Sequence, residues 1–319
     1  MELNSEIPTA PPRDAATVVI LRDSAHGPEV FLVKRHGLSD VLGGAYVFPG
    51  GKMDAADSAL GHHAYLDQSP HQLHAALGET DTTPETACGL FIAALRETYE
   101  ESGVLFAQNA QSENHQANPE VAGAAKGSDF HQRLESGSLR LQTLAVHPWS
   151  RWITPRMPSV TNKRFDTRFF ISVMPAGQNA AHDDFEATES AWLRPRVALE
   201  QYWEREIELA PPQIMSLAHL SRYQNAEQAM AAARAAMPPV IMPEAFHEND
   251  ERVICYPGHA RHPVAQRALP GPLQLFWRNK RFEPAGGFEA LCAYSLIDRH
   301  AQSGILSLPI RRRHIGGLS

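Results

Sequence analysis

The chain has 319 residues, of which 43% are hydrophobic and 20% are charged, a balance typical of folded domains that excludes wholesale disorder. Its formal net charge of −7 gives no general attraction to nucleic-acid polymers or anionic membranes, so we expect neither as a partner. Three scattered cysteines, no apolar leader and no apolar run of membrane-spanning length favour a cytoplasmic protein.

Short β-strands come first in chain order, after a polar stretch over residues 1–14 that we expect to be flexible. Residues 17–22 and 30–35 are rich in β-branched side chains and flank a turn, which is typical of a hairpin. A short strand over residues 45–48 then leads into Pro49-Gly50-Gly51. The two glycines there permit close approach of the backbone to a ligand.

Two polar stretches interrupt the pattern of strands and helices. Residues 54–85 are rich in histidine, and residues 109–145 begin with a run of glutamine, asparagine, alanine and glycine. We predict that both are loop-like insertions. The first should tolerate shortening with modest loss of stability, because long surface loops cost little closure entropy. The second is predicted to hold one short helix near residues 130–135 and to carry no chemistry.

Between these insertions, residues 85–102 have apolar side chains three to four positions apart, with Gly103 just past the end, which predicts a helix. Further along, residues 149–154, 164–174 and 187–193 are predicted strands, and three helices are predicted over residues 196–206, 211–223 and 226–237. The expected organisation is one α/β domain over residues 15–237, followed by a small β-rich C-terminal appendix over residues 238–319.

The helix over residues 85–102 carries three carboxylates on one face. Glu97, Glu100 and Glu101 stand at positions i, i+3 and i+4, so they project within one helical turn. Like charges this close repel one another. The arrangement is therefore typical either of a solvated surface or of a site where divalent cations neutralise the charge, and the carboxylates alone leave both interpretations open.

Two neighbouring features favour the cation site: the Gly50-Gly51 turn and Arg96, which precedes Glu97. Together they resemble the Nudix box, in which a glycine, five residues, a glutamate and seven residues precede Arg-Glu-apolar-any-Glu-Glu-any-Gly-apolar. The chain departs from this pattern in three ways. Asp57 replaces the first glutamate, 38 residues instead of seven separate it from Arg96, and Thr98 replaces an apolar residue.

A box that is split in this way resembles the peroxisomal coenzyme A diphosphatase branch of the Nudix hydrolases and its bacterial relatives. The same resemblance extends to His147-Pro148-Trp149, to Trp152-Ile153-Thr154-Pro155 and to the run Arg-Phe-Asp-Thr-Arg-Phe-Phe over residues 164–170. It covers about residues 15–225. It implies a Nudix fold, that is, a mixed β-sheet sandwiched between helices.

The resemblance also implies roles for single residues. Glu97, Glu100, Glu101 and the Gly50 carbonyl would hold Mg²⁺ or Mn²⁺, and Arg96 would orient the carboxylates. Hard cations of this kind prefer such oxygen ligands and bind diphosphates at the same time. The remaining candidates extend this set: Glu186 as an additional catalytic carboxylate, and, as substrate-binding residues, Gly51, Arg35, Arg164 and Arg168.

Arg35, Arg164 and Arg168 are phosphate-binding candidates because guanidinium groups match phosphate oxygens, although a solvated sheet edge explains them equally well. Arg164 and Arg168 share one face of their predicted strand, and Lys163 faces the other way.

The predicted function is metal-dependent hydrolysis of a diphosphate linkage in a nucleotide-containing small molecule, foremost coenzyme A or acyl-coenzyme A, giving 3',5'-ADP and 4'-phosphopantetheine. A second hypothesis is a diphosphatase for ADP-ribose, dinucleotides or nucleotide sugars. A third is a Nudix fold that senses a ligand without turnover. The sequence also permits a homodimer.

Overall fold

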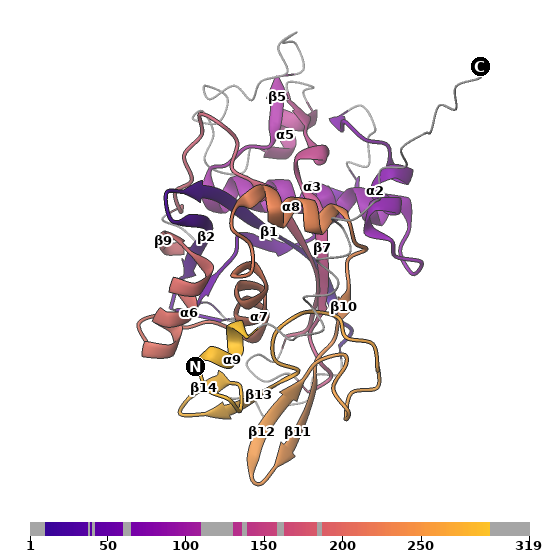
Figure 1. Cartoon of the computed structure of the whole chain (residues 1–319). Helices are drawn as coiled ribbons and strands as arrows, with labels where there is room; N and C mark the ends of the chain where they lie inside the picture. Colours follow the sequence, from indigo (N-terminus) through magenta and orange to yellow (C-terminus); the bar gives the residue numbers. More distant parts are fainter. Residues whose placement is uncertain are drawn as a thin grey trace, which may run out of the picture.

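A mixed sheet forms the centre of the protein in the computed structural model, which describes residues 10–37, 39, 42–59, 65–109, 130–135, 139–157, 163–183 and 187–293 (Figure 1). The strands follow the order β10-β7-β8-β1-β2-β3, with β4 also paired to β1 and β9 to β2. β1 runs parallel to β8 and antiparallel to β2. The strands are β1 (Arg13–Ser24), β2 (Gly27–Arg35), β3 (Tyr46–Val47), β4 (Gly50–Lys52), β7 (His147–Ile153), β8 (Phe165–Val173), β9 (Ala187–Leu193) and β10 (Val240–Ile241).

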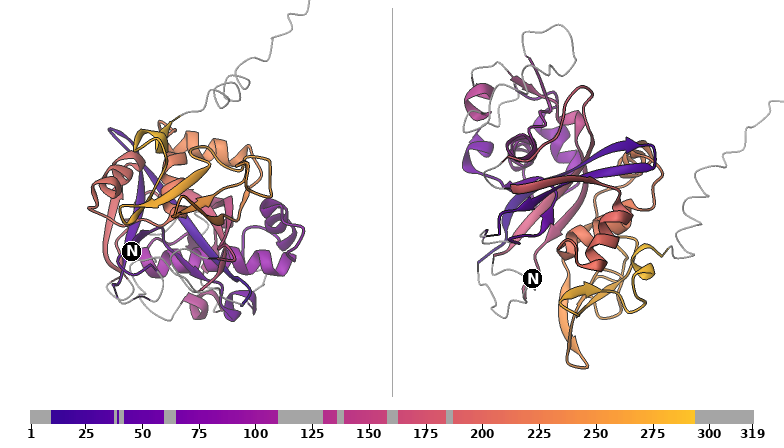
Figure 2. Two further views of the ribbon diagram at one scale, coloured as in Figure 1. Left: turned by 90° about the horizontal axis from the view of Figure 1, so that it is seen from below. Right: turned by 90° about the vertical axis from the view of Figure 1, so that its left-hand side faces the viewer.

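Helices cover both faces of this sheet. One face carries α1 (Ala55–Ala59), α2 (Pro70–Leu77), α3 (Pro84–Ser102) and α5 (Phe130–Glu135), with the small β5 (Ala107–Asn109) and β6 (Leu139–Leu141) pair and the 3-10 turn η2 (Thr143–Ala145) beside them. The other face carries α6 (Pro195–Glu204), α7 (Pro211–Leu220) and α8 (Ala226–Arg234). The side view separates the two layers (Figure 2). The expected sheet between helices is confirmed, as are the helices and strands expected there, with bounds shifted by a few residues.

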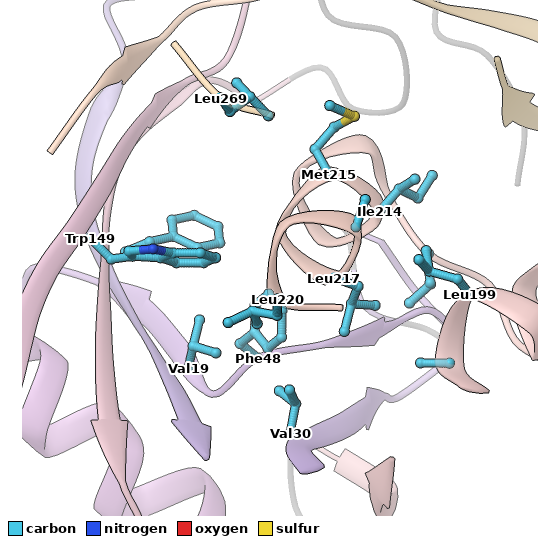
Figure 3. Packing of buried hydrophobic residues seen from close by; sticks show 14 of the residues in the cluster. Val19, Val30, Phe48, Trp149, Leu199, Ile214, Met215, Leu217, Leu220 and Leu269 are labelled. Carbon is cyan, nitrogen blue, oxygen red and sulfur yellow. The ribbon is translucent and has the colours of Figure 1, made fainter. Parts of the chain in front are cut away.

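Alternation along β1 explains how one strand serves both layers. Val18 and Ile20 belong to the hydrophobic core under α3, whereas Val19 and Leu21 belong to the core under α6 and α7. Successive side chains of a strand point to opposite faces, so a continuous apolar run is the pattern of a strand that is covered on both sides. In the second core, Leu217 and Leu220 of α7 point toward Val19 and Val30 of the sheet (Figure 3).

The helix α3 begins and ends where local chemistry sets its limits. Thr83 caps its N-terminus by accepting a hydrogen bond from the backbone N–H of Thr86, and Pro84 occupies the first turn. Gly103 ends it in the left-handed conformation at φ 70°. The helix expected over residues 85–102 is thereby confirmed.

The first insertion is not the loop that we expected. Ser69 and Gln72 form a capping box at the start of α2, and Leu73 and Leu77 of this helix lie in the core against α3. The expectation was wrong because histidines and prolines dominate the composition of this stretch and hide two leucines at helical spacing. Shortening it would therefore remove part of the core.

The C-terminal region also packs more closely than an appendix would. Its own sheet joins β11 (Glu244–Glu248), β12 (Glu251–Cys255), β13 (Gln274–Arg278) and β14 (Arg281–Glu283), and the short helix α9 (Glu289–Cys292) follows. Tyr256, Leu275 and Phe282 are fully buried in the same core as Leu199 of α6 and Met215 of α7. Among the described residues, none of the helices combines the length and apolarity that crossing a membrane requires.

We expect Leu73→Ala to lower the free energy of unfolding by about 2–5 kcal/mol, because it leaves a cavity at a position with no exposed surface. Urea denaturation followed by circular dichroism measures this change. Leu144→Ala is the matched control, since Leu144 is 69% exposed and should change stability by less than about 0.5 kcal/mol. Equal stability of the two variants would mean that α2 contributes nothing to the core.

Candidate active site

The guanidinium of Arg96 lies at the centre of the candidate site. Its Nε and Nη2 donate to the two carboxylate oxygens of Asp57, each at 2.9 Å, while Nη1 donates to Glu97 at 2.9 Å and to Glu100 at 2.8 Å. Burial by itself would lower the pKa of Arg96, but the hydrogen-bonded Asp57 and the nearby Glu97 and Glu100 more than reverse this and raise the pKa. Arg96 therefore stays charged and holds the carboxylates in place.

Asp57 joins the two halves of the split box. It is fully buried on α1, where it binds Arg96 and also accepts a hydrogen bond from the backbone N–H of Asp54 at 2.8 Å. The Nε2 atom of His131 lies 2.9 Å from the same carboxylate. The helix α1 brings Asp57 close enough to Arg96 for the shorter side chain of an aspartate to reach it. Asp57 can therefore occupy the place of the first glutamate of the box.

The two glycines let the backbone of β4 approach α3. The N–H of Gly50 donates to Glu101 at 2.9 Å, and a Cβ atom at Gly51 would collide with the carboxylate of Glu97. A Cβ atom at Gly50 would collide with the backbone of Ala16 and the side chain of Thr17 on β1. Both positions therefore require glycine for close packing.

A cavity of about 1060 Å³ opens beside this cluster. Gly50, Gly51, Glu97 and Glu100 line one part of it. The cations Arg13, Arg35, Lys52 and Lys163 line it as well, together with apolar side chains, and this composition suits a charged ligand with an extended apolar portion. The apolar lining residues include Phe48, Trp152, Phe169, Pro211, Pro212, Pro243 and Ile254.

The carboxylates do not converge as a preformed metal site. In the part of the chain that the structure describes, no group of three or more His, Cys, Asp and Glu side chains is arranged to hold a metal ion. Glu97 and Glu100 instead point to Arg96, and Glu101 accepts a hydrogen bond from Gly50. The donor set nevertheless consists of carboxylate oxygens beside an open cavity, which is the chemistry that hard divalent cations bind.

The predicted phosphate-binding arginines separate into two groups. Arg35 lines the cavity, and its buried Nε has no hydrogen-bond partner among the described residues. Arg164 donates instead to the backbone carbonyls of Thr154 and Pro155. Neither Arg164 nor Arg168 lines the cavity.

Arg168 is a correction to the sequence-based expectation. Its side chain is only 3% exposed, and it donates to Glu79 at 2.9 and 2.6 Å and to Asp14. Burial works against its charged form, but the hydrogen-bonded Glu79 and neighbouring Asp166 raise its pKa. Its donors are satisfied within the protein, so Arg168 ties α2's following loop to β8 and does not contact substrate in this arrangement.

Two residues that line the cavity were not expected from the sequence, and a third lining residue was assigned to the opposite face of its strand. His131 and Phe130 of α5 line the cavity, although the second insertion was expected to carry no chemistry. Lys163, set aside because it faces away from Arg164, also lines the cavity. Strand alternation had separated Lys163 from Arg164 and Arg168 correctly, but we expected the face of the two arginines to border the site, and the face of Lys163 borders it instead. Glu186 lies outside the described residues.

Comparisons with known proteins agree with this geometry. The crystal structure of a Nudix hydrolase from Alicyclobacillus acidocaldarius is similar with a TM-score of 0.55 at 27% sequence identity, covering 70% of this chain and 97% of that chain. A family model described as the NUDT19 Nudix domain matches residues 69–220. The fold, the matching family model and the arginine–carboxylate site together support a Nudix diphosphatase.

Within that class the chain resembles the acyl-coenzyme A diphosphatases. The Xenopus laevis protein named acyl-coenzyme A diphosphatase NUDT19 is 28% identical over 264 residues, which cover 66% of this chain and 70% of the relative. The Homo sapiens protein of the same name is 31% identical over 234 residues, which cover 62% of each chain. The chain thus spans less than two thirds of the human relative.

We expect Glu100→Gln to lower kcat at least tenfold, about 1.4 kcal/mol of barrier, while the protein stays folded. The substitution removes one charge from a carboxylate that is one-third exposed, and the glutamine keeps an oxygen that can accept from Arg96, so we expect the fold to remain. Steady-state kinetics with circular dichroism make the comparison, and Glu227→Gln on the exposed face of α8 is the control. Full activity of Glu100→Gln would remove Glu100 from the catalytic set.

Arg168→Met should destabilise the protein by about 3–5 kcal/mol and leave KM unchanged, because it removes one of the two guanidinium partners of the buried Glu79 and leaves only Arg151 beside it. Arg22→Met breaks the exposed pair with Glu29 and should cost about 0–1 kcal/mol. Urea denaturation and KM are measured on both variants. A raised KM with unchanged stability would restore Arg168 as a substrate-binding residue.

Proposed function

We propose that the protein hydrolyses the diphosphate of coenzyme A or acyl-coenzyme A to 3',5'-ADP and 4'-phosphopantetheine or its acyl form. The observation that carries the proposal is the cavity, which joins the arginine–carboxylate cluster to several cations and to an extended apolar wall. Coenzyme A has groups that match these surfaces. It carries a diphosphate in its middle, a 3'-phosphate on the adenosine at one end and a long, largely aliphatic arm at the other. The printed names of the relatives support the same substrate class.

Mg²⁺ or Mn²⁺ fits the residues at the cluster. Glu97, Glu100 and Glu101 with the Gly50 carbonyl would hold it, as hard cations prefer oxygen ligands. When bound, such an ion supplies charge neutralisation at the diphosphate and makes a bound water more acidic. Nudix hydrolases generally depend on a divalent metal; which ion serves this protein is part of the proposal.

The protein's own side chains supply the rest of the chemistry. Arg96 fixes the orientation of Glu97 and Glu100 at the cavity wall. Gly50 and Gly51 carry no side chains, so a diphosphate can approach the backbone of β4. Glu100 is the more exposed of the two carboxylates, so it is placed to accept a proton from the attacking water. Glu186 remains a second candidate for this role.

Arg35 is our candidate for recognising the 3'-phosphate. Its unpartnered Nε and its place at the cavity leave donors for a charge-assisted bond, which contributes about 1.5–3 kcal/mol. An ADP-ribose, dinucleotide or nucleotide-sugar diphosphatase would share the cluster and need no such cation.

We expect kcat/KM for coenzyme A to exceed that for 3'-dephospho-coenzyme A by about tenfold or more, and ADP-ribose to be poorer still. Arg35→Met should remove this preference, whereas Arg234→Met on the exposed surface of α8 should keep it. Initial rates are measured with each substrate in Mg²⁺, in Mn²⁺ and after chelation, which should abolish turnover. A wild-type preference for ADP-ribose would favour the alternative substrate class and leave the Nudix assignment intact.

A further inference from the structure

The N-terminus of α7 and the C-terminal region build one wall of the cavity. Ala210, Pro211, Pro212 and Gln213 line it from α7, and Pro243 and Ile254 line it from the segments around β11 and β12. The last two residues lie beyond residue 220, where the Nudix family model ends. The wall thus includes a region to which the Nudix chemistry assigns no role.

Gln213 is the polar residue of this wall. It is only 6% exposed, and its Oε1 has no hydrogen-bond partner within the described ranges. It also carries the first backbone N–H of α7, because Pro211 and Pro212 have none, and helix geometry gives that N–H no partner inside the helix. Ala210, the N-cap residue, supplies no side-chain hydrogen bond. Gln213 thus lines the cavity and carries both a buried carboxamide oxygen without a partner in the described part of the chain and the first backbone N–H of α7.

Buried polar groups in native proteins are nearly always hydrogen-bonded, so a buried carboxamide oxygen without a protein partner calls for a donor from outside the chain, which a ligand or a water molecule supplies. A half-turn of the carboxamide exchanges its oxygen and nitrogen, which lets it offer an acceptor or a donor to a group in the cavity. The neighbouring Pro211 and Pro212 have apolar rings and no backbone N–H, so they do not compete for these hydrogen bonds.

The surroundings of Gln213 favour a chain over a nucleobase. Trp152 is 5% exposed, its ring packs against Phe169 and Tyr256 at centroid distances of 6.1 Å, and its Nε1 donates to Ser150. Phe169 in turn packs edge-on against Phe48. These rings therefore offer narrow apolar surfaces and no broad open face for base stacking, whereas prolines and Ile254 suit aliphatic groups.

We propose that Gln213 and the N-terminus of α7 form a subsite for an aliphatic chain that carries amide groups, the pantetheine arm of the substrate. An amide carbonyl accepts from the backbone N–H, and an amide N–H donates to the side-chain oxygen of Gln213. Pro212, Pro243 and Ile254 pack against the methylene groups between them. This inference rests on the proposed function, because it names the part of coenzyme A that this wall contacts.

The test measures binding of the two product halves separately by isothermal titration calorimetry. Wild type, Gln213→Met and the control Gln201→Met, on α6 and outside the cavity lining, are titrated with 4'-phosphopantetheine and with 3',5'-ADP. We expect Gln213→Met to weaken 4'-phosphopantetheine about tenfold, or 1.4 kcal/mol, and 3',5'-ADP less than twofold. Gln213→Asn, which shortens the amide, should have the same direction of effect and serves if the methionine variant does not fold.

Each other result overturns the subsite. Weaker 3',5'-ADP binding in Gln213→Met would assign this wall to the nucleotide half, and unchanged binding of both halves would show that Gln213 contacts neither. Failure of the proposed function is distinguishable, since wild type would then not hydrolyse coenzyme A at all. If wild type hydrolyses coenzyme A but Gln213→Met binds 4'-phosphopantetheine as tightly as wild type does, the subsite is rejected and the proposed function stands.

Discussion

The ion cluster around Arg96 is the constraint on which the site depends. A guanidinium that is nearly inaccessible to solvent is stable only with its charge balanced, and Asp57 supplies that balance from the other side of a long insertion. The Nη1 atom of Arg96 then donates to Glu97 and Glu100 and holds both carboxylates at the cavity. Removing one partner of such a buried pair typically costs about 3–5 kcal/mol, so the same contact supports folding and function.

The insertion is tied into the fold by a second ion network. Glu79, which follows α2, is buried between Arg151 of β7 and Arg168 of β8, and Arg151 also binds Asp81 and Asp166. These contacts hold the segment between the two halves of the box against the sheet. The interruption is therefore a packed layer beside α3, and its leucines complete the core there.

The cavity draws on both faces of the sheet. α3 and β4 bring the charged cluster from one layer, whereas α7 and the C-terminal strands bring the apolar wall from the other. Because Ile254 and Tyr256 share the core of α6 and α7, packing holds this wall in place. In the function that we propose, diphosphate chemistry and selection of the rest of the substrate are thus tasks of separate parts of the chain.

Local patterns in the sequence predicted the cluster on α3 and most elements of the central sheet and its covering helices, but they missed α2. The spacing of Glu97, Glu100 and Glu101 and the alternation of β1 follow from periods of 3.6 and 2 residues, and the cap at Gly103 follows from the left-handed conformation that glycine adopts at a helix end. None of these features needs a tertiary contact. The resemblance to the Nudix box placed Asp57 at the position of its first glutamate, and the tertiary structure then showed that Asp57 pairs with Arg96.

Tertiary structure alone decided which cations face the cavity, since strand alternation separates Lys163 from Arg164 and Arg168 but does not say which face borders the site. It also decided that Gln213 and Ile254 border the site, because contacts between segments distant in sequence leave no period in either of them.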